Sequence, residues 1–179
     1  MACITKLANA IAYDCDSGAT GLISAMIINK ADIASFDIDA STGVISRLSL
    51  VGGATPFKID TVKRSLVVSS ALKVNDGAPN AYTHSATIVY TGLPNAAYRN
   101  TMASLANGSF VIIVRRVGNS SGDPYGLYYG LSATGVDSSS HDNGGWTTIA
   151  MATPEGVIGE DTLTLVQSEY DRLYAAAVG

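Results

Sequence analysis

Apolar and polar residues alternate at a period of two along most of this chain of 179 residues, and turn residues interrupt the alternation at short intervals. In the segment 32–39, Ala34, Phe36 and Ile38 alternate with polar residues, and a short polar turn leads to a second alternating segment at 44–50. This pattern is typical of a domain built from β-strands, and the two segments predict a hairpin.

Apolar runs mark the strands that we expect at the centre of the structure. The segment 21–28 predicts a strand buried on both faces, and 110–114 predicts a short central strand. Further strands are predicted at 125–132, 146–151 and 161–166.

The longest extended segments lie at 62–74 and 82–91, with a polar loop between them. Together they predict an extended hairpin over residues 62–91 that projects as an arm beyond a compact body. An exposed strand edge recruits a neighbouring chain, so such an arm is a liability in a monomer and useful in an assembly.

One α-helix is predicted at 95–107, where Tyr98, Met102 and Leu105 share a face. A proline just before this segment and a glycine just after it fit the start and the end of a helix.

The remaining segments are predicted to be irregular. Residues 136–145, rich in serine, aspartate and glycine, predict a loop, and residues 1–20 an N-terminal arm. The C-terminal tail, 167–179, is expected to end either as a short helix or docked on a neighbour. No internal repeat or linker divides the chain, so we predict a single β domain over residues 1–179.

Charged residues make up only 15% of the chain, against about 25% in typical domains, and the net charge is −4. This sparse, acidic charge argues against a protein that reads nucleic-acid sequence, because such proteins normally present a basic face. The sequence also lacks the roughly 18 to 20 consecutive apolar residues of a membrane-spanning helix.

The two cysteines, Cys3 and Cys15, are interpreted as small buried residues with free thiols. The start of the chain lacks the features of a signal peptide, which favours synthesis in the cytosol. A disulfide between the two cysteines is expected only if the protein later meets an oxidising environment.

No enzyme, cofactor or metal site is predicted. His84 shares a strand face with Ala86 and Ile88 and is interpreted as a residue of the sheet. His141 and Asp142 lie in a predicted loop, which does not hold catalytic groups with the precision that chemistry needs. The histidines and cysteines also lack metal-ligand spacing. An enzyme with His141 as its base is the weakest of the alternatives.

Aromatic residues are the one set that suggests binding: Tyr125, Tyr128, Tyr129 and Trp146. Tyrosine is favoured wherever one end of a side chain is buried and the other is wet. These residues would line a carbohydrate-binding groove, form a subunit contact or pack within the β core. The first possibility defines an alternative function, a carbohydrate-binding β-sandwich module.

The order of elements, with a β-rich body, a long hairpin arm and one amphipathic helix between strands, resembles the tail tube proteins of tailed bacteriophages. The N-terminal motif is Met1-Ala2-Cys3, then Asp14-Cys15, then Gly18 and Gly21 before an apolar strand. This motif is similar to the start of structural proteins from phages of Bacteroidetes hosts, including crAss-like phages.

The resemblance implies a β-sandwich or barrel of the tail tube type with one flanking helix and a long hairpin arm. It implies a virion structural protein, made in the host cytoplasm and located in the phage tail, whose rings of six copies stack into a tube. Its partners would be its own copies, other tail or neck proteins, and phage DNA passing through the lumen without sequence recognition. A ring of six would carry a charge of about −24, which repels DNA phosphates if it faces the lumen. A neck-ring or head-decoration protein is the alternative within this class.

Overall fold

The computed structural model describes residues 22–59, 66–74, 77, 80–91, 100, 103–105, 107–116, 126–141, 146–154, 157, 159 and 162–179. Most of these residues lie in strands, so the prediction of a mainly β fold is confirmed. The predicted N-terminal arm at 1–20, with Cys3 and Cys15, lies outside the described residues.

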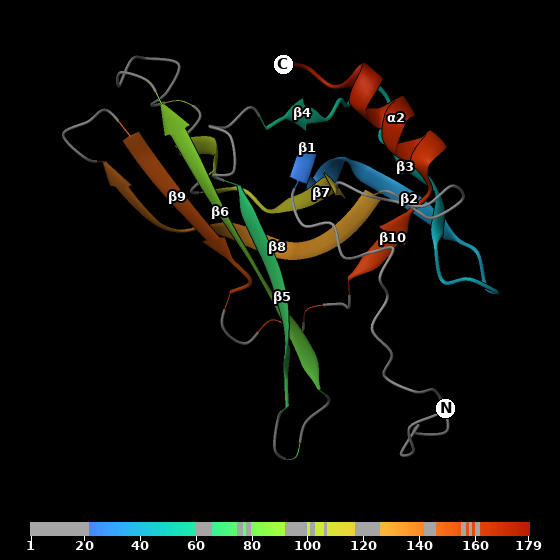
Figure 1. Ribbon diagram of the computed structural model, residues 1–179, viewed down its shortest axis with the longest axis horizontal. Coiled ribbons are helices and arrows are strands. Elements are labelled where there is room, and N and C mark those ends of the chain that lie inside the picture. Colours follow the sequence, from blue (N-terminus) through green and yellow to red (C-terminus); the bar gives the residue numbers. More distant parts are fainter. Residues whose placement is uncertain are drawn as a thin grey trace.

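The described part of the chain forms ten strands, one short 3-10 turn and a C-terminal helix (Figure 1). Their bounds are β1 (Leu22–Asn29), η1 (Lys30–Asp32), β2 (Ile33–Ile38), β3 (Ile45–Leu50), β4 (Phe57–Lys58), β5 (Val67–Lys73), β6 (Ala81–Thr91), β7 (Phe110–Arg116), β8 (Gly126–His141), β9 (Trp146–Ala152), β10 (Leu163–Leu165) and α2 (Gln167–Ala176).

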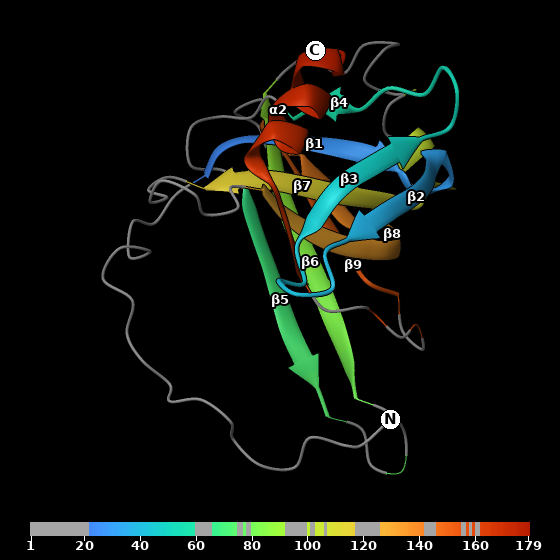
Figure 2. The same ribbon diagram turned by 90° about the vertical axis from the view of Figure 1, so that its right-hand side faces the viewer.

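The strands form two connected sheets (Figures 1 and 2). The first sheet has the order β2-β3-β10-β8-β7-β1-β4, and the second continues from β8 through β9 and β6 to β5. Residues 126–134 of β8 pair with β7 and β10, whereas residues 135–141 pair with β9. The long strand β8 therefore belongs to both sheets and carries the chain from one to the other.

Two hydrophobic clusters lie on opposite faces of the first sheet. One packs beneath α2 and the other against β6 and β9 of the second sheet. The central strands β1 and β7 contribute to both clusters: Met26, Ile28, Val111 and Ile113 lie under the helix, and Ala25, Phe110, Ile112 and Val114 face the second sheet. Alternate residues of a strand point to opposite faces, so the continuous apolar runs at 21–28 and 110–114 give strands buried on both sides, as predicted.

The predicted hairpin at 32–50 is also confirmed, because β2 and β3 pair in antiparallel register. The turn between them is fixed by Asp39, whose Oδ1 accepts hydrogen bonds from the backbone N–H of Ser41 at 2.7 Å and of Thr42 at 3.3 Å. The Ser41 hydroxyl also donates to Asp39, and these bonds lower the pKa of the Asp39 carboxyl. Gly43 completes the turn with a φ of 70°, where a side chain is strained.

The described residues of the predicted helix 95–107, which are Asn100, Ala103 to Leu105 and Asn107, have helical backbone. The Ser104 hydroxyl donates to the Asn100 carbonyl at 3.0 Å, one turn earlier. Leu105 packs on the cluster between the two sheets, which is the apolar face that the sequence predicts.

The prediction of a loop at 136–145 is wrong for its first six residues. Residues 136–141 continue β8 and pair with β9 from Met151 to Thr147. Serine and aspartate have low strand propensity, but a partner strand outweighs that preference because strand propensity depends mainly on context.

Helix α2 is fixed to β3 by two charged side chains. Glu169 Oε1 accepts a hydrogen bond from the Leu48 N–H at 2.8 Å, and the Arg172 guanidinium donates to the Leu48 carbonyl at 2.9 Å. Arg172 also binds both oxygens of Glu169, at 2.6 and 2.7 Å. The pair therefore satisfies the edge of β3 in the way that a neighbouring strand would, while Tyr170 and Leu173 fill the core beneath the helix.

The buried carboxylate of Glu169 makes stability depend on pH. Burial is the largest single effect and raises the pKa of Glu169, but the hydrogen bonds from Arg172 and Leu48, together with the positive charges of Arg172 and Arg47, lower the pKa overall. A carboxyl whose pKa is lowered by folding adds stability above its unfolded pKa, and this contribution is lost as pH falls through the folded value.

Replacing Glu169 by Gln removes the charge but keeps the shape, and we expect a loss of about 1–3 kcal/mol in the free energy of unfolding at pH 7. Urea unfolding at pH 7 and at lower pH values measures the loss, and the gap between wild type and variant should narrow below about pH 4.5 as Glu169 protonates. Asp171→Asn is the control, because this exposed residue makes one ion pair of 3.5 Å with Arg115 and its loss should cost under about 1 kcal/mol. A gap that stays constant down to acid pH would contradict the role of the charge.

Candidate assembly surface

The hairpin of β5 and β6 forms an arm that extends past the two-sheet body (Figures 1 and 2). Seven consecutive pairs join the strands, from Val67 opposite Thr87 to Lys73 opposite Ala81. Only residues 85–91 of β6 pair with β9, so residues 81–84 lie beyond the end of that strand. The arm is built from the outer halves of two strands whose inner halves are anchored in the core.

The inner edge of β6 is satisfied by the chain itself where β9 ends. The Thr153 N–H donates to the His84 carbonyl at 3.0 Å, and the His84 N–H donates to the Thr153 hydroxyl at 3.0 Å. One step further out, the Tyr82 N–H donates to the Gly159 carbonyl at 3.1 Å. In the arm, therefore, β6 has partners on both sides.

Strand β5 is the outermost strand of the arm. Within the described residues it pairs with β6 alone, and no other described backbone group bonds to residues 67–73. Alternate residues of a strand direct N–H and C=O groups to each side, so one row of these groups lies on the outer edge of β5. That edge is a template on which a further strand can add.

The apolar side chains of β5 continue from the core into solvent. Leu66 and Val68 pack against the cluster between the sheets, together with Ala86 and Ile88 of β6. On the same face, Leu72 is 54% exposed and Val74 is 71% exposed. Large apolar side chains that are exposed together on a projecting strand are typical of a surface that binds another chain.

Serines lie between the two ends of β5. The hydroxyls of Ser69 and Ser85 lie 2.7 Å apart across the hairpin. Ser70 lies opposite His84, and its buried hydroxyl has no hydrogen-bond partner in the part of the chain that the structure describes. These polar positions lie between Val68, which packs on the core, and the exposed Leu72.

A second exposed surface lies on β2, the last strand of the first sheet in the described order. Phe36 is 43% exposed and Ile38 is 44% exposed. Both follow Ala34 on the apolar face of β2, and their partners Leu48 and Ile45 on β3 are fully buried under α2. The apolar face of the first sheet thus extends past the helix that covers it.

The histidines and aromatic residues singled out in the sequence are not gathered into one site. His84 lies in β6, as its interpretation as a sheet residue predicts, but it is fully buried and not half-buried as expected. His141 ends β8, and Trp146 begins β9 next to the partner of His141. Tyr128 and Tyr129 pair with β7 near the start of β8, whereas Trp146 lies beside the end of β8. Most of the length of β8 therefore separates the two tyrosines from Trp146. Tyr125 and Asp142 lie outside the described residues.

Among the described residues, no group of three histidine, cysteine or acidic side chains lies close enough to hold a metal ion. Asp37 and Asp39 are both exposed at the β2–β3 turn. No helix in the described ranges is long and apolar enough to cross a membrane.

The bridge between Gly159 and Tyr82 tests how the arm is held. A β-carbon at Gly159 would overlap the Tyr82 carbonyl oxygen, so Gly159→Ala should break this bridge and cost about 1–3 kcal/mol. Gly52→Ala is the control, because a β-carbon there meets nothing within 4 Å and should change stability by less than about 0.5 kcal/mol. Urea unfolding gives both values, and amide exchange of residues 81–84 should rise only in the first variant. Equal effects of the two substitutions would contradict the proposed support.

Comparisons of this chain with protein-family models, with curated proteins and with solved structures found no match.

Proposed function

We propose that this protein is a structural subunit of a phage tail tube, which assembles with copies of itself through the arm formed by β5 and β6. The observation that carries the proposal is the outer edge of β5. Within the described residues, this edge has no backbone partner, and exposed apolar side chains lie on the same projecting strand. A defined partner that covers an edge of this kind prevents uncontrolled aggregation.

The composition supports an assembling subunit. Charged residues are scarce, at 15% of the chain, and the centres of subunit interfaces are depleted of charge. The exposed β5 residues Val67 and Leu72 are separated by a valine, two serines and an alanine. The segment from Val67 to Leu72 can be buried against another chain without stranding a buried ion, whose desolvation would be costly.

The resemblance to tail tube proteins gives the kind of assembly. In that assembly, rings of this chain stack into a tube inside the virion, and the net charge of −4 per copy keeps DNA from sticking to the wall as it passes. The protein acts by association and by lining a channel, so the proposal assigns it no catalytic group.

The proposal predicts that the full chain forms rings or tubes at micromolar concentration and that lysines on the arm prevent this. In the double variant Leu72→Lys/Val74→Lys, both side chains are already exposed in the monomer, so the fold should be retained. Loss of their burial should raise the concentration for half-maximal assembly at least about tenfold. Light scattering after size-exclusion chromatography measures assembly, and negative-stain electron microscopy identifies rings or tubes.

Val178→Lys is the matched control. Val178 is also exposed, but it lies at the C-terminal end of the chain, next to β4. This variant should assemble like the wild type. A wild-type chain that stays monomeric at high concentration would contradict the proposed function, and so would an arm variant that assembles normally.

A further inference from the structure

Self-association through the arm leaves open which surface of the next copy receives it. Apart from Val51 and Val157, the exposed large apolar side chains in the described part of the chain form three groups. They are the arm with Val67, Leu72 and Val74, the β2 surface with Phe36 and Ile38, and the region of β4 and the C-terminus with Phe57 and Val178. An arm that met a second arm would give a closed pair, whereas an arm that met a different surface would give a ring or a filament.

The charges around these surfaces distinguish them. On the described residues of β5, Lys73 is the charged side chain. The hairpin of β2 and β3 carries the exposed Asp37 and Asp39, and Arg47 lies opposite Asp37. The exposed end of β5 is therefore positive, whereas residues 33–50 of the hairpin have a net formal charge of −1 (two aspartates and one arginine).

The third surface carries the same sign of charge as the arm. Lys58 lies within β4, and its ammonium group is 5.0 Å from the centre of the Tyr174 ring. Contact between β5 and β4 of the next copy would bring Lys73 near Lys58, and like charges across an interface oppose binding. Contact between two arms would likewise bring together two copies of Lys73.

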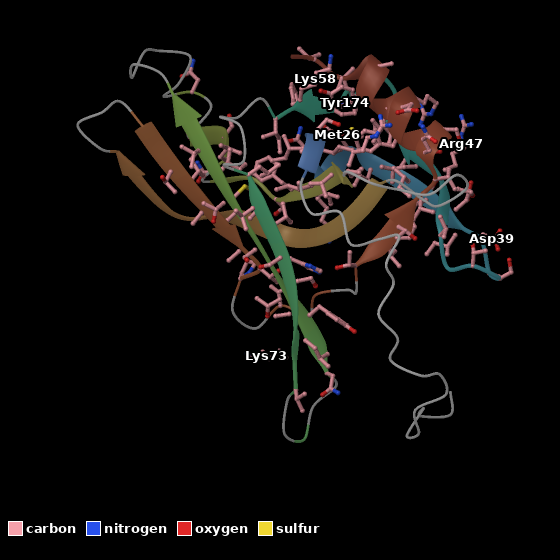
Figure 3. The ribbon with its side chains drawn as sticks, viewed as in Figure 1. Met26, Asp39, Arg47, Lys58, Lys73 and Tyr174 are labelled. Carbon is pink, nitrogen blue, oxygen red and sulfur yellow. The ribbon has the colours of Figure 1, made fainter. Side chains whose placement is uncertain are left out.

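The positions of the two oppositely charged surfaces also favour a contact between copies. Lys73 lies toward the free end of the arm and Asp39 at the tip of the β2–β3 hairpin, and Figure 3 shows them on different sides of the molecule. The arm extends away from the body and not toward β2 (Figure 1). The strands themselves are of similar length, with seven residues in β5 and six in β2.

We infer that the arm of one copy docks on the β2–β3 hairpin of the next copy, with Leu72 and Val74 against Phe36 and Ile38 and with Lys73 near Asp37. This inference rests on the proposed function, since it names the receiving surface of the same assembly. The contact joins two different surfaces, so every copy both donates an arm and receives one. Such a head-to-tail contact continues until the ring closes, which a contact between identical arms cannot do.

Photo-crosslinking tests which surface receives the arm. A benzophenone side chain at position 74 replaces an exposed residue, and the labelled chain is mixed with copies enriched in ¹⁵N so that contacts between copies are recognised by mass. Trypsin cleaves after Lys30 and Arg47, so the peptide 31–47 carries β2 and the whole turn. We expect the crosslinks between copies to fall mainly on this peptide. Crosslinks on the arm or on β4 would overturn the inference.

Charge reversal supplies an independent readout. Lys73→Glu and Asp37→Lys should each raise the concentration for half-maximal assembly about three- to tenfold, and the two combined should restore it. Lys58→Glu changes the net charge as Lys73→Glu does and should leave assembly unchanged. Urea unfolding confirms that each variant is folded, because Asp37 lies opposite Arg47 in the hairpin.

The outcomes separate the inference from the proposed function. Rings or tubes that form, but with crosslinks elsewhere and no rescue by the double reversal, overturn the receiving surface and leave self-assembly standing. A chain that forms no assembly at any concentration overturns both.

Discussion

The hydrogen-bonding groups at the edges of the strands are the constraint on which this structure depends. The N–H and C=O groups along each strand edge need hydrogen-bond partners. In this chain, side chains and backbone segments that are not neighbouring strands supply several of these partners. Side chains of Glu169 and Arg172 satisfy Leu48 on β3, the backbone of Val178 binds both Lys58 and Pro56 beside β4, and Thr153 and Gly159 satisfy β6. Within the described residues, the outer edge of β5 receives no such partner. The arm therefore has a strand edge that no described residue covers.

The two ends of the arm have different physical roles. At its root, Val68 and Ala86 belong to the core between the sheets, so the strands cannot detach without exposing apolar surface. At its outer end, Leu72 and Val74 are exposed. In the proposed assembly, the arm would lose little conformational entropy on binding another copy, because its hairpin is already ordered in the single chain.

The local pattern was enough to predict most of the strands and the long hairpin. Alternation predicts the β2–β3 hairpin and the paired strands β5 and β6, and unbroken apolar runs predict the buried strands β1 and β7. Periodicity succeeds here because the face to which a side chain points is fixed by its position in the strand. It failed at 136–141, where polar residues form a strand because β9 lies beside them. Of the candidate surface, the sequence predicted only the long hairpin. The exposure of Leu72 and Val74 could not be predicted, because it depends on where the two-sheet body ends along the hairpin.

The sequence by itself determined the fold class, the central strands, the low charge and the presence of a long hairpin, because these follow from composition and from the spacing of residues along the chain. Only the tertiary structure decided which edges are covered. The Glu169–Arg172 pair meets Leu48 across more than a hundred residues of sequence, and Gly159 meets Tyr82 from another part of the chain. Hydrogen bonds between segments distant in sequence depend on the register and the packing of whole sheets, which no local pattern encodes.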